Sequence, residues 1–212
     1  FVLKGHGEAA AFILENLPVG SKVSYTYSVH PRGEDLLAAV GGQALLVEDG
    51  HLPAYFTQNI PGNNARTAVG ISRDGSTLYL VAVEKQTAPD GSVLSRGMTQ
   101  EELTEFLISL GVWRAVNLDG GGSTTLAARH LGDSEASLIN RPQGLSQRAV
   151  PNAIGLFSTA PAGDLKGLFI SGPNTILTGT KGEFTAKGYD EYYNPFRVIP
   201  TQVEWTVSPA SA

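Results

Sequence analysis

The stretch Asn117-Leu118-Asp119-Gly120-Gly121-Gly122-Ser123-Thr124-Thr125 organises this chain and follows a largely apolar run at 113–116. Each glycine inside a strand or helix costs roughly 0.5–1 kcal/mol relative to alanine, so core packing does not explain three in a row. Positive φ angles, close approach of a ligand to the backbone, or N–H groups directed at an anion do explain them. We therefore predict that a site lies here, at the end of a strand over 113–118.

The composition describes a globular chain that is rich in turns. Hydrophobic residues make up 42% and charged residues 17%, with 25 glycines and 12 prolines, so strands and loops should outweigh helices. The net charge of -5 and the scattered lysines and arginines argue against nucleic acid as a partner. The absence of cysteine excludes thiol nucleophiles, disulfides and thiolate metal sites. No apolar run approaches the roughly 18 residues of a transmembrane helix, so we expect no membrane insertion.

Hydrophobic periodicity predicts an α+β fold, with a mixed, largely antiparallel sheet and a few packing helices. Asp74-Gly75 indicates a hairpin, and Thr99 with Glu102 forms a capping box for a helix that ends at Gly111. A second helix is expected over 8–17, and a short turn or helix over 36–40. The predicted strands span 2–4, 22–29, 43–47, 66–72, 77–84, 113–118, 124–129 and 149–157, with loops over 51–65 and 85–97.

The composition and the spacing of the predicted strands change near residue 158. We predict a domain over 1–158, a linker over 159–164, and a partial β-sandwich module over 165–212. Within that module, short strands are expected at 168–170, 175–177, 182–187 and 202–207.

Asp119 is the main candidate for chemistry, because it follows a strand directly and precedes the glycines. The alternative is a turn-initiating aspartate that caps its own loop. A phosphate-binding P-loop is excluded because no lysine follows the glycines, and a nucleophile elbow is excluded because Ser123 has no following glycine in the required position. The four histidines show no spacing typical of a metal site.

Further charged residues lie near the predicted loop ends. Glu84 ends an apolar strand and is either a second carboxylate of the site or a strand-edge surface charge. Arg66, Arg141 and Arg148 are either solvated charges or a bidentate clamp for phosphate or carboxylate, which the planar guanidinium suits.

Six segments occur in an order that resembles the phosphodiester glycosidase family over about residues 1–157. They are Gly41–Gly50, Arg66–Gly70 with its Asp74-Gly75 hairpin, Gly97–Leu103, Asn117–Thr125, Asn140–Pro142 and Arg148–Ala153. The resemblance implies a hydrolase that acts on a sugar 1-phosphodiester of the α-GlcNAc-1-phosphodiester type. It also implies a carbohydrate or sugar-phosphate partner, and we predict no cofactor.

The resemblance gives roles to the candidate residues. Asp119 would be the catalytic base or nucleophile, with Glu84 as the second catalytic group. Arg66 and Arg148 would hold the phosphate, the glycine turn would hold the sugar or a diester oxygen, and Asn117 and Asn152 would orient the substrate or Asp119. The full expected substrate-binding set is Arg66, Thr67, Asn117, Gly120, Gly121, Gly122, Ser123, Thr124, Arg141, Arg148 and Asn152.

The sequence departs from the family pattern at two places. An Asn-Gly-Gly-Phe-Phe-like motif would lie before Phe1, so we expect part of the domain to lie upstream, and Gln147 stands where many members have a glutamate.

Residues 165–207 resemble the first part of a bacterial immunoglobulin-like domain, which implies an extracellular or cell-wall-associated protein.

Two other interpretations stay open: a non-catalytic surface module that binds glycan or phosphodiester, and a calcium site at the Asp119 turn. The oligomeric state is not predicted.

Overall fold

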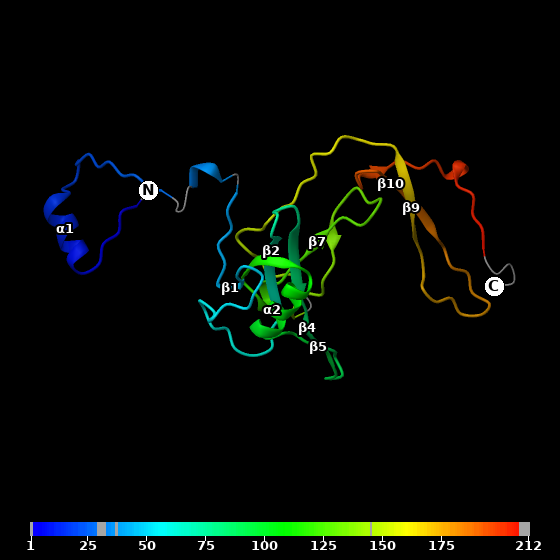
Figure 1. Cartoon of the computed structure of the whole chain (residues 1–212), viewed down its shortest axis with the longest axis horizontal. Helices are drawn as coiled ribbons and strands as arrows, with labels where there is room; N and C mark the ends of the chain where they lie inside the picture. The colour runs from blue at the N-terminus through cyan, green and yellow to red at the C-terminus, as the bar shows by residue number, and fades with distance from the viewer. Residues whose placement is uncertain (1, 29–32, 37, 145, 208–212) are drawn as a thin grey trace. The chain divides into compact units, whose positions relative to one another are not determined.

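The computed structural model describes residues 2–28, 33–36, 38–144 and 146–207. The chain divides into two units, residues 1–39 and 40–212, and each is described by itself. The first unit contains helix α1 (Glu8–Asn16) and a 3-10 turn at Gly33–Asp35 (Figure 1). Glu8 lies in the first turn of α1, where a carboxylate is favoured by the helix dipole, and this confirms the predicted N-terminal helix.

Two predicted strands of the first unit are wrong. Residues 2–4 and 22–28 have no regular secondary structure, and Val23 is 55% exposed. An alternating pattern produces a strand only when a neighbouring strand completes its hydrogen bonds, and no described residue of this unit does so. Val29 and Leu37, which belong to predicted elements, lie outside the described residues.

A four-stranded sheet forms the centre of the second unit (Figure 1). Its order is β1 (Ala44–Val47), β6 (Val112–Asn117), β2 (Arg66–Ser72) and β3 (Leu78–Val83). All three pairings are antiparallel, which confirms the predicted α+β class and the four strands that compose the sheet. The β2–β3 connection turns at Gly75, whose φ of 73° fits the predicted Asp-Gly hairpin.

Helix α2 (Gln100–Ser109) packs against β1 and β6. The predicted capping box is present: the Thr99 side chain accepts the Glu102 N–H at 3.1 Å, and Glu102 Oε2 accepts the Thr99 N–H at 2.9 Å. The helix is followed by Gly111 with φ 84°, as predicted. The hydrophobic core lies between this helix and the sheet and consists of Leu46, Val47, Ala68, Leu103, Leu107, Val112 and Ala115.

Two small hairpins flank the sheet. Strands β4 (Lys85–Thr87) and β5 (Val93–Arg96) pair within the segment predicted as a loop, so that prediction is wrong. The turn between them is stabilised by the Asp90 carboxylate, which accepts the Ser92 N–H at 2.9 Å, a local bond that makes a tight hairpin possible. Strands β7 (Ala127–Ala128) and β8 (Ser137–Leu138) form the second hairpin, much shorter than the strand predicted over 124–129.

Residues 149–157 do not form the predicted final strand. They are irregular and exposed, and no backbone ladder includes them among the described residues.

Beyond them, β9 (Leu165–Ser171), β10 (Thr185–Asp190) and β11 (Pro195–Phe196) form a three-stranded antiparallel sheet. The predicted strands at 175–177 and 202–207 are absent, and a 3-10 turn occupies Pro200–Gln202. The immunoglobulin-like assignment stays a prediction.

The helices in the described part of the chain are all too short or too polar to cross a lipid bilayer.

Candidate functional site

The antiparallel sheet brings the candidate site together at one of its ends. Asn117, the last residue of β6, is paired with Ala44 at the start of β1 and with Ala68 near the start of β2. The end of β6 therefore lies between the beginnings of two neighbouring strands. A pocket of about 250 Å³ opens there, and it is lined by Gln43, Gln58, Ile60, Asn64, Ala65, Arg66, Asn117, Asp119, Gly120 and Gly121.

The glycine turn packs directly on the backbone of the segment that leads into β2. The Gly121 N–H donates to the Ala65 carbonyl at 2.8 Å. A Cβ on Gly120 would lie 2.6 Å from that carbonyl oxygen, and Gly121 has φ 58°. Two of the three glycines are therefore required by the fold, one for a close approach and one for a left-handed backbone, while the turn forms one wall of the pocket.

Asp119 is exposed and lines the pocket. Its Oδ1 accepts the N–H of Gly120 at 3.1 Å, which holds the carboxylate at the start of the turn. The local bond is the one expected of a turn-capping aspartate, but the second oxygen, Oδ2, makes no hydrogen bond within the described part of the chain. Asp119 therefore caps its own turn, and its role in chemistry stays a prediction.

Arg66, the first residue of β2, lines the same pocket, but most of its side chain is buried, with 2% exposure. Its Nε donates to the Met98 carbonyl at 2.6 Å, and Nη2 donates to the carbonyls of Ile60 and Gly62, both at 2.9 Å. Burial lowers the pKa of Arg66, and the nearby Glu101 opposes that shift. The guanidinium thus fixes the pocket wall at 60–62, which sequence reasoning did not foresee.

Asn117 is 1% exposed, and its Nδ2 donates to Gln43 Oε1 at 3.2 Å and to the Leu118 carbonyl at 2.6 Å. Its Oδ1 is buried and has no hydrogen-bond partner among the described residues. A buried amide oxygen that accepts no hydrogen bond costs free energy. A hydrogen-bond donor on a bound ligand or water molecule would therefore be stabilised beside Asn117 Oδ1. Asn117 connects β6 to the pocket residue Gln43.

Thr67 and Thr124 join the two sides of the turn. Thr67 Oγ1 and Thr124 Oγ1 lie 3.2 Å apart in a hydrogen bond, and Thr124 is 1% exposed. The Thr67 carbonyl accepts the N–H of Leu118 at 2.8 Å. These two threonines, which we predicted as substrate-binding residues, hold the turn against β2 and do not line the pocket.

Glu84, directly after β3, does not line the pocket. Because β3 pairs with β2, Glu84 lies at the same end of the sheet as Asp119, but β2 intervenes. Two strand spacings separate β3 from β6, roughly 10 Å. The Glu84 Oε1 accepts the backbone N–H of Arg141 at 2.6 Å. The structure therefore brings Glu84 to the Asn140–Pro142 segment.

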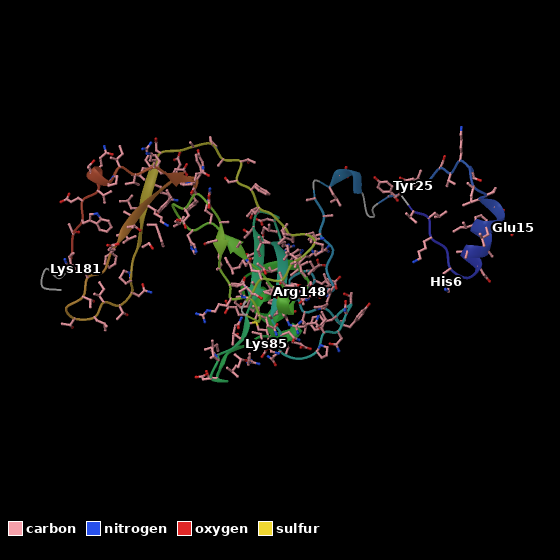
Figure 2. The ribbon with its side chains drawn as sticks, turned by 180° about the vertical axis from the view of Figure 1, so that it is seen from behind. His6, Glu15, Tyr25, Lys85, Arg148 and Lys181 are labelled. Carbon is pink, nitrogen blue, oxygen red and sulfur yellow. The ribbon has the colours of Figure 1, made fainter. Side chains whose placement is uncertain are left out.

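Arg148, whose side chain is labelled in Figure 2, is exposed and lies beside the glycine turn. Its Cδ is 3.6 Å from the position that a Cβ on Gly122 would take. Arg141 and Asn152 are also exposed, and their side chains make no hydrogen bond within the described residues. Ser123 belongs to the 3-10 turn Gly121–Ser123, and its N–H donates to the Gly120 carbonyl at 3.1 Å. Arg148 is thus the exposed cation that the structure brings to the turn.

Sequence reasoning missed several residues of the pocket: Gln43, Gln58, Ile60, Asn64 and Ala65. Gln58 to Ala65 belong to the loop predicted over 51–65, where Pro61, Gly62 and two asparagines indicated a loop long enough to carry contacts. Gln43 follows two glycines and directly precedes β1, and no sequence pattern predicted that its side chain would line a pocket. Only the pairing of β1 with β6 shows that Gln43 reaches Asn117.

The chemistry of the pocket is that of a polar site with one exposed carboxylate. Within the ranges that the structure describes, no three His, Asp or Glu side chains gather in a way that could hold a metal ion. Asp119 shares the pocket with the amide residues Gln43, Gln58, Asn64 and Asn117 and with Arg66, whereas the N–H groups of Gly120 and Gly121 are bonded to Asp119 Oδ1 and the Ala65 carbonyl. Such an arrangement suits a ligand rich in hydroxyl and anionic oxygens.

The chain is similar to known proteins of one enzyme family. The chain matches the profile of the phosphodiester glycosidase family over residues 4–157. It is similar to N-acetylglucosamine-1-phosphodiester alpha-N-acetylglucosaminidase of mouse, 36% identical over 83 residues, which is 39% of this chain and 15% of the relative. The human enzyme of the same name is 42% identical over 70 residues, covering 33% of this chain and 12% of the relative.

Among solved structures, the zebrafish catalytic domain of that name, auto-inhibited by its pro-peptide, aligns with 27% identity and a TM-score of 0.35. The alignment covers 54% of this chain and 39% of that chain. The chain therefore spans a small part of the relatives that it matches. Since the family profile covers most of its length, the chain belongs to the phosphodiester glycosidase family.

Proposed function

We propose that this chain carries the glycosidase site of an enzyme that hydrolyses a sugar 1-phosphodiester of the α-GlcNAc-1-phosphodiester type. Membership of the phosphodiester glycosidase family supports this proposal. One observation carries it: Asp119 and Arg66, predicted as carboxylate and cation of the site, line one polar pocket at the glycine turn. The mouse and human relatives are named for the same bond.

Hydrolysis at the anomeric carbon breaks the bond between C1 and the phosphate oxygen, and water supplies the new hydroxyl group. The phosphomonoester that leaves is a weak base, so it needs less protonation than an alcohol. One carboxylate in the pocket therefore suffices when cations neutralise the leaving phosphate. Asp119 either accepts the proton of the attacking water or attacks C1 itself before water releases the sugar.

The surrounding residues have separate tasks in this proposal. The exposed guanidinium of Arg148 holds the phosphate beside the turn, since it has no hydrogen-bond partner among the described residues. Arg66 shapes the wall of the pocket through its three carbonyl bonds and adds positive potential there. Gly120 and Gly121 allow the turn to pack on the Ala65 carbonyl, so the turn forms a wall of the pocket against which the sugar would lie.

Asp119→Asn is the first test. The Asn Oδ1 can still accept the Gly120 N–H, so the turn keeps its capping bond while the carboxylate is lost. We expect kcat for an α-GlcNAc-1-phosphodiester to fall by at least about a hundredfold, with an unchanged urea midpoint. Steady-state kinetics of the full-length protein measure this, and hydrolysis at the wild-type rate would remove Asp119 from the mechanism.

Arg148→Ala separates phosphate recognition from sugar recognition. We expect the KM for the charged diester to rise about tenfold or more, because a charge-assisted contact to the phosphate is lost. A neutral aryl α-GlcNAc glycoside lacks that phosphate, so its KM should not change. Equal losses on both substrates would contradict a phosphate role for Arg148. Arg129→Ala, which removes an exposed arginine outside the turn, is the matched control.

The rival interpretation, a module that binds glycan or phosphodiester without turnover, is decided by the same assay. Product release by the wild-type protein supports the enzyme. Saturable binding of the diester, measured by calorimetry with no product formed, supports the binding module and overturns the proposed function.

A further inference from the structure

Glu84 and Gln86 together hold the backbone of Arg141 and Pro142. The Glu84 Oε1 accepts the Arg141 N–H at 2.6 Å. The Gln86 Nε2 donates to the carbonyls of Arg141 at 2.9 Å and of Pro142 at 2.5 Å. Glu84 joins β3 to β4, and Gln86 lies within β4, two positions later, so both side chains point to the same side of an extended backbone. We call this pair the 84/86 clamp.

Both side chains of the clamp are bonded to the backbone that they hold. Gln86 is 6% exposed, and its amide would be left unsatisfied in the interior without the two carbonyls. Glu84 Oε1 is engaged by the Arg141 N–H, which belongs to the backbone. Neither side chain lines the pocket that contains Asp119.

The segment that the clamp holds is also attached to the other side of the turn. Asn140, 7% exposed, donates through Nδ2 to the Thr124 carbonyl at 3.0 Å and accepts the Leu126 N–H at 2.6 Å. Residues 140–142 therefore connect the β3–β4 stretch to the segment that follows the glycine turn. Deleting either attachment would free the segment from one of its two supports.

Gln143 continues directly from the clamped residues toward the turn. Its Oε1 lies 3.6 Å from the Cβ position at Gly121, a residue that lines the Asp119 pocket. Gln143 also lines a second pocket of about 320 Å³, together with Lys85, Gln86, Thr87 and Gly144. The clamp therefore positions the Gln143 side chain between the two pockets.

We propose that Glu84 and Gln86 are positioning residues, which fix Asn140–Gly144 so that Gln143 borders the Asp119 site, and that Glu84 is not a second catalytic carboxylate. The expected effect on turnover rests on the proposed function, whereas the clamp itself rests only on the observed hydrogen bonds. It reassigns Glu84, which the sequence predicted as a second catalytic carboxylate.

Glu84→Gln and Glu84→Ala test the proposal in the full chain. The glutamine retains an oxygen that accepts the Arg141 N–H, whereas the alanine removes it. We expect hydrogen exchange over 140–144 to be accelerated at least about tenfold in Glu84→Ala, and to stay close to wild type in Glu84→Gln. The kcat/KM for the diester should follow the same order, with an unchanged pH profile in Glu84→Gln. Glu135→Ala, an exposed glutamate outside the clamp, is the control.

The possible outcomes separate the two roles. If Glu84→Gln loses kcat as completely as Glu84→Ala while exchange over 140–144 stays slow, Glu84 is a titrating catalytic group and the proposal is overturned. Unchanged exchange in Glu84→Ala also overturns it. If the wild-type protein hydrolyses no diester, the proposed function fails, and the exchange measurement alone still decides whether the clamp exists. Gln86→Ala, expected to accelerate exchange at the same residues, provides a second variant if Glu84→Ala does not fold.

Discussion

Gly120 and Gly122 are two positions apart in the same turn, but their surroundings differ. A Cβ on Gly120 would lie 2.6 Å from the Ala65 carbonyl oxygen, which belongs to the backbone and cannot rotate away. A Cβ on Gly122 would meet only the Arg148 Cδ, at 3.6 Å, an ordinary van der Waals contact. The sequence alone presents these glycines as equivalent, and only the packing of the turn on the start of β2 distinguishes them.

Alanine substitutions at these two positions should therefore differ. Gly120→Ala is expected to lower the free energy of unfolding by about 1–3 kcal/mol, because the added methyl group forces the turn away from β2. Gly122→Ala should change it by less than about 0.5 kcal/mol. Urea denaturation of both variants measures the difference, and equal stabilities would contradict the close approach at Gly120.

Arg66 shows the limit of reasoning from residue type. An arginine at a strand start after a loop was predicted to bind phosphate, and the structure does place it in the pocket wall. Its guanidinium, however, donates to the carbonyls of Ile60 and Gly62 in the preceding loop and of Met98, which lies 32 residues later. No local pattern predicts the Met98 contact, because it depends on how the later chain packs beside the start of β2.

At the scale of elements, helix α2 was predictable because its signals are local. The capping box, the helical spacing of Leu103 and Leu107, and the terminal Gly111 all lie within one short segment. The β4–β5 hairpin was missed because its strands are only three and four residues long and carry little apolar alternation. Short strands depend on their partner, and a partner is not visible in a strand's own sequence.

The capping box also predicts a pH dependence of stability. The Thr99 N–H, followed by the side chain of Arg96, holds the pKa of Glu102 below its ordinary value. A lowered pKa means that the unfolded chain binds the proton more readily than the folded chain, so protonation favours unfolding. The contribution of Glu102 is therefore fully present above about pH 4.3 and is lost as the pH falls through the lower folded value.

Glu102→Gln is the variant that isolates this contribution. Glutamine keeps an oxygen for the Thr99 N–H but does not titrate, so the free energy of unfolding should fall less steeply with acidification than in the wild type. Urea denaturation across the acidic range measures both slopes. Identical slopes for the two proteins would show that Glu102 does not have a lowered pKa.

At the scale of the whole molecule, the described structure predicts that protection from amide hydrogen exchange differs between the central strands and residues 149–157. Strands β2 and β6 are each hydrogen-bonded on both sides and support the core, whereas residues 149–157 take part in no backbone ladder. Amide exchange should therefore be slowest in β2 and β6 and close to that of an unstructured peptide over 149–157. Mass-spectrometric exchange measures this directly. Strong protection over 149–157 would show that this segment pairs with a further strand.

The sequence by itself determined the four strands of the sheet, helix α2 and a family resemblance that the comparisons confirmed, and it predicted a site at the glycine turn. These features are carried by local patterns or by contiguous motifs. Only the tertiary structure decided that Asp119 and Arg66 share a pocket with Gln43, that Glu84 is bonded to the Arg141 backbone, and that 22–28 and 149–157 are not strands. The physical reason is that a pocket, a buried cation and a strand each require partners from distant parts of the chain, and those partners are fixed by the pairing of β1, β2 and β3 around β6.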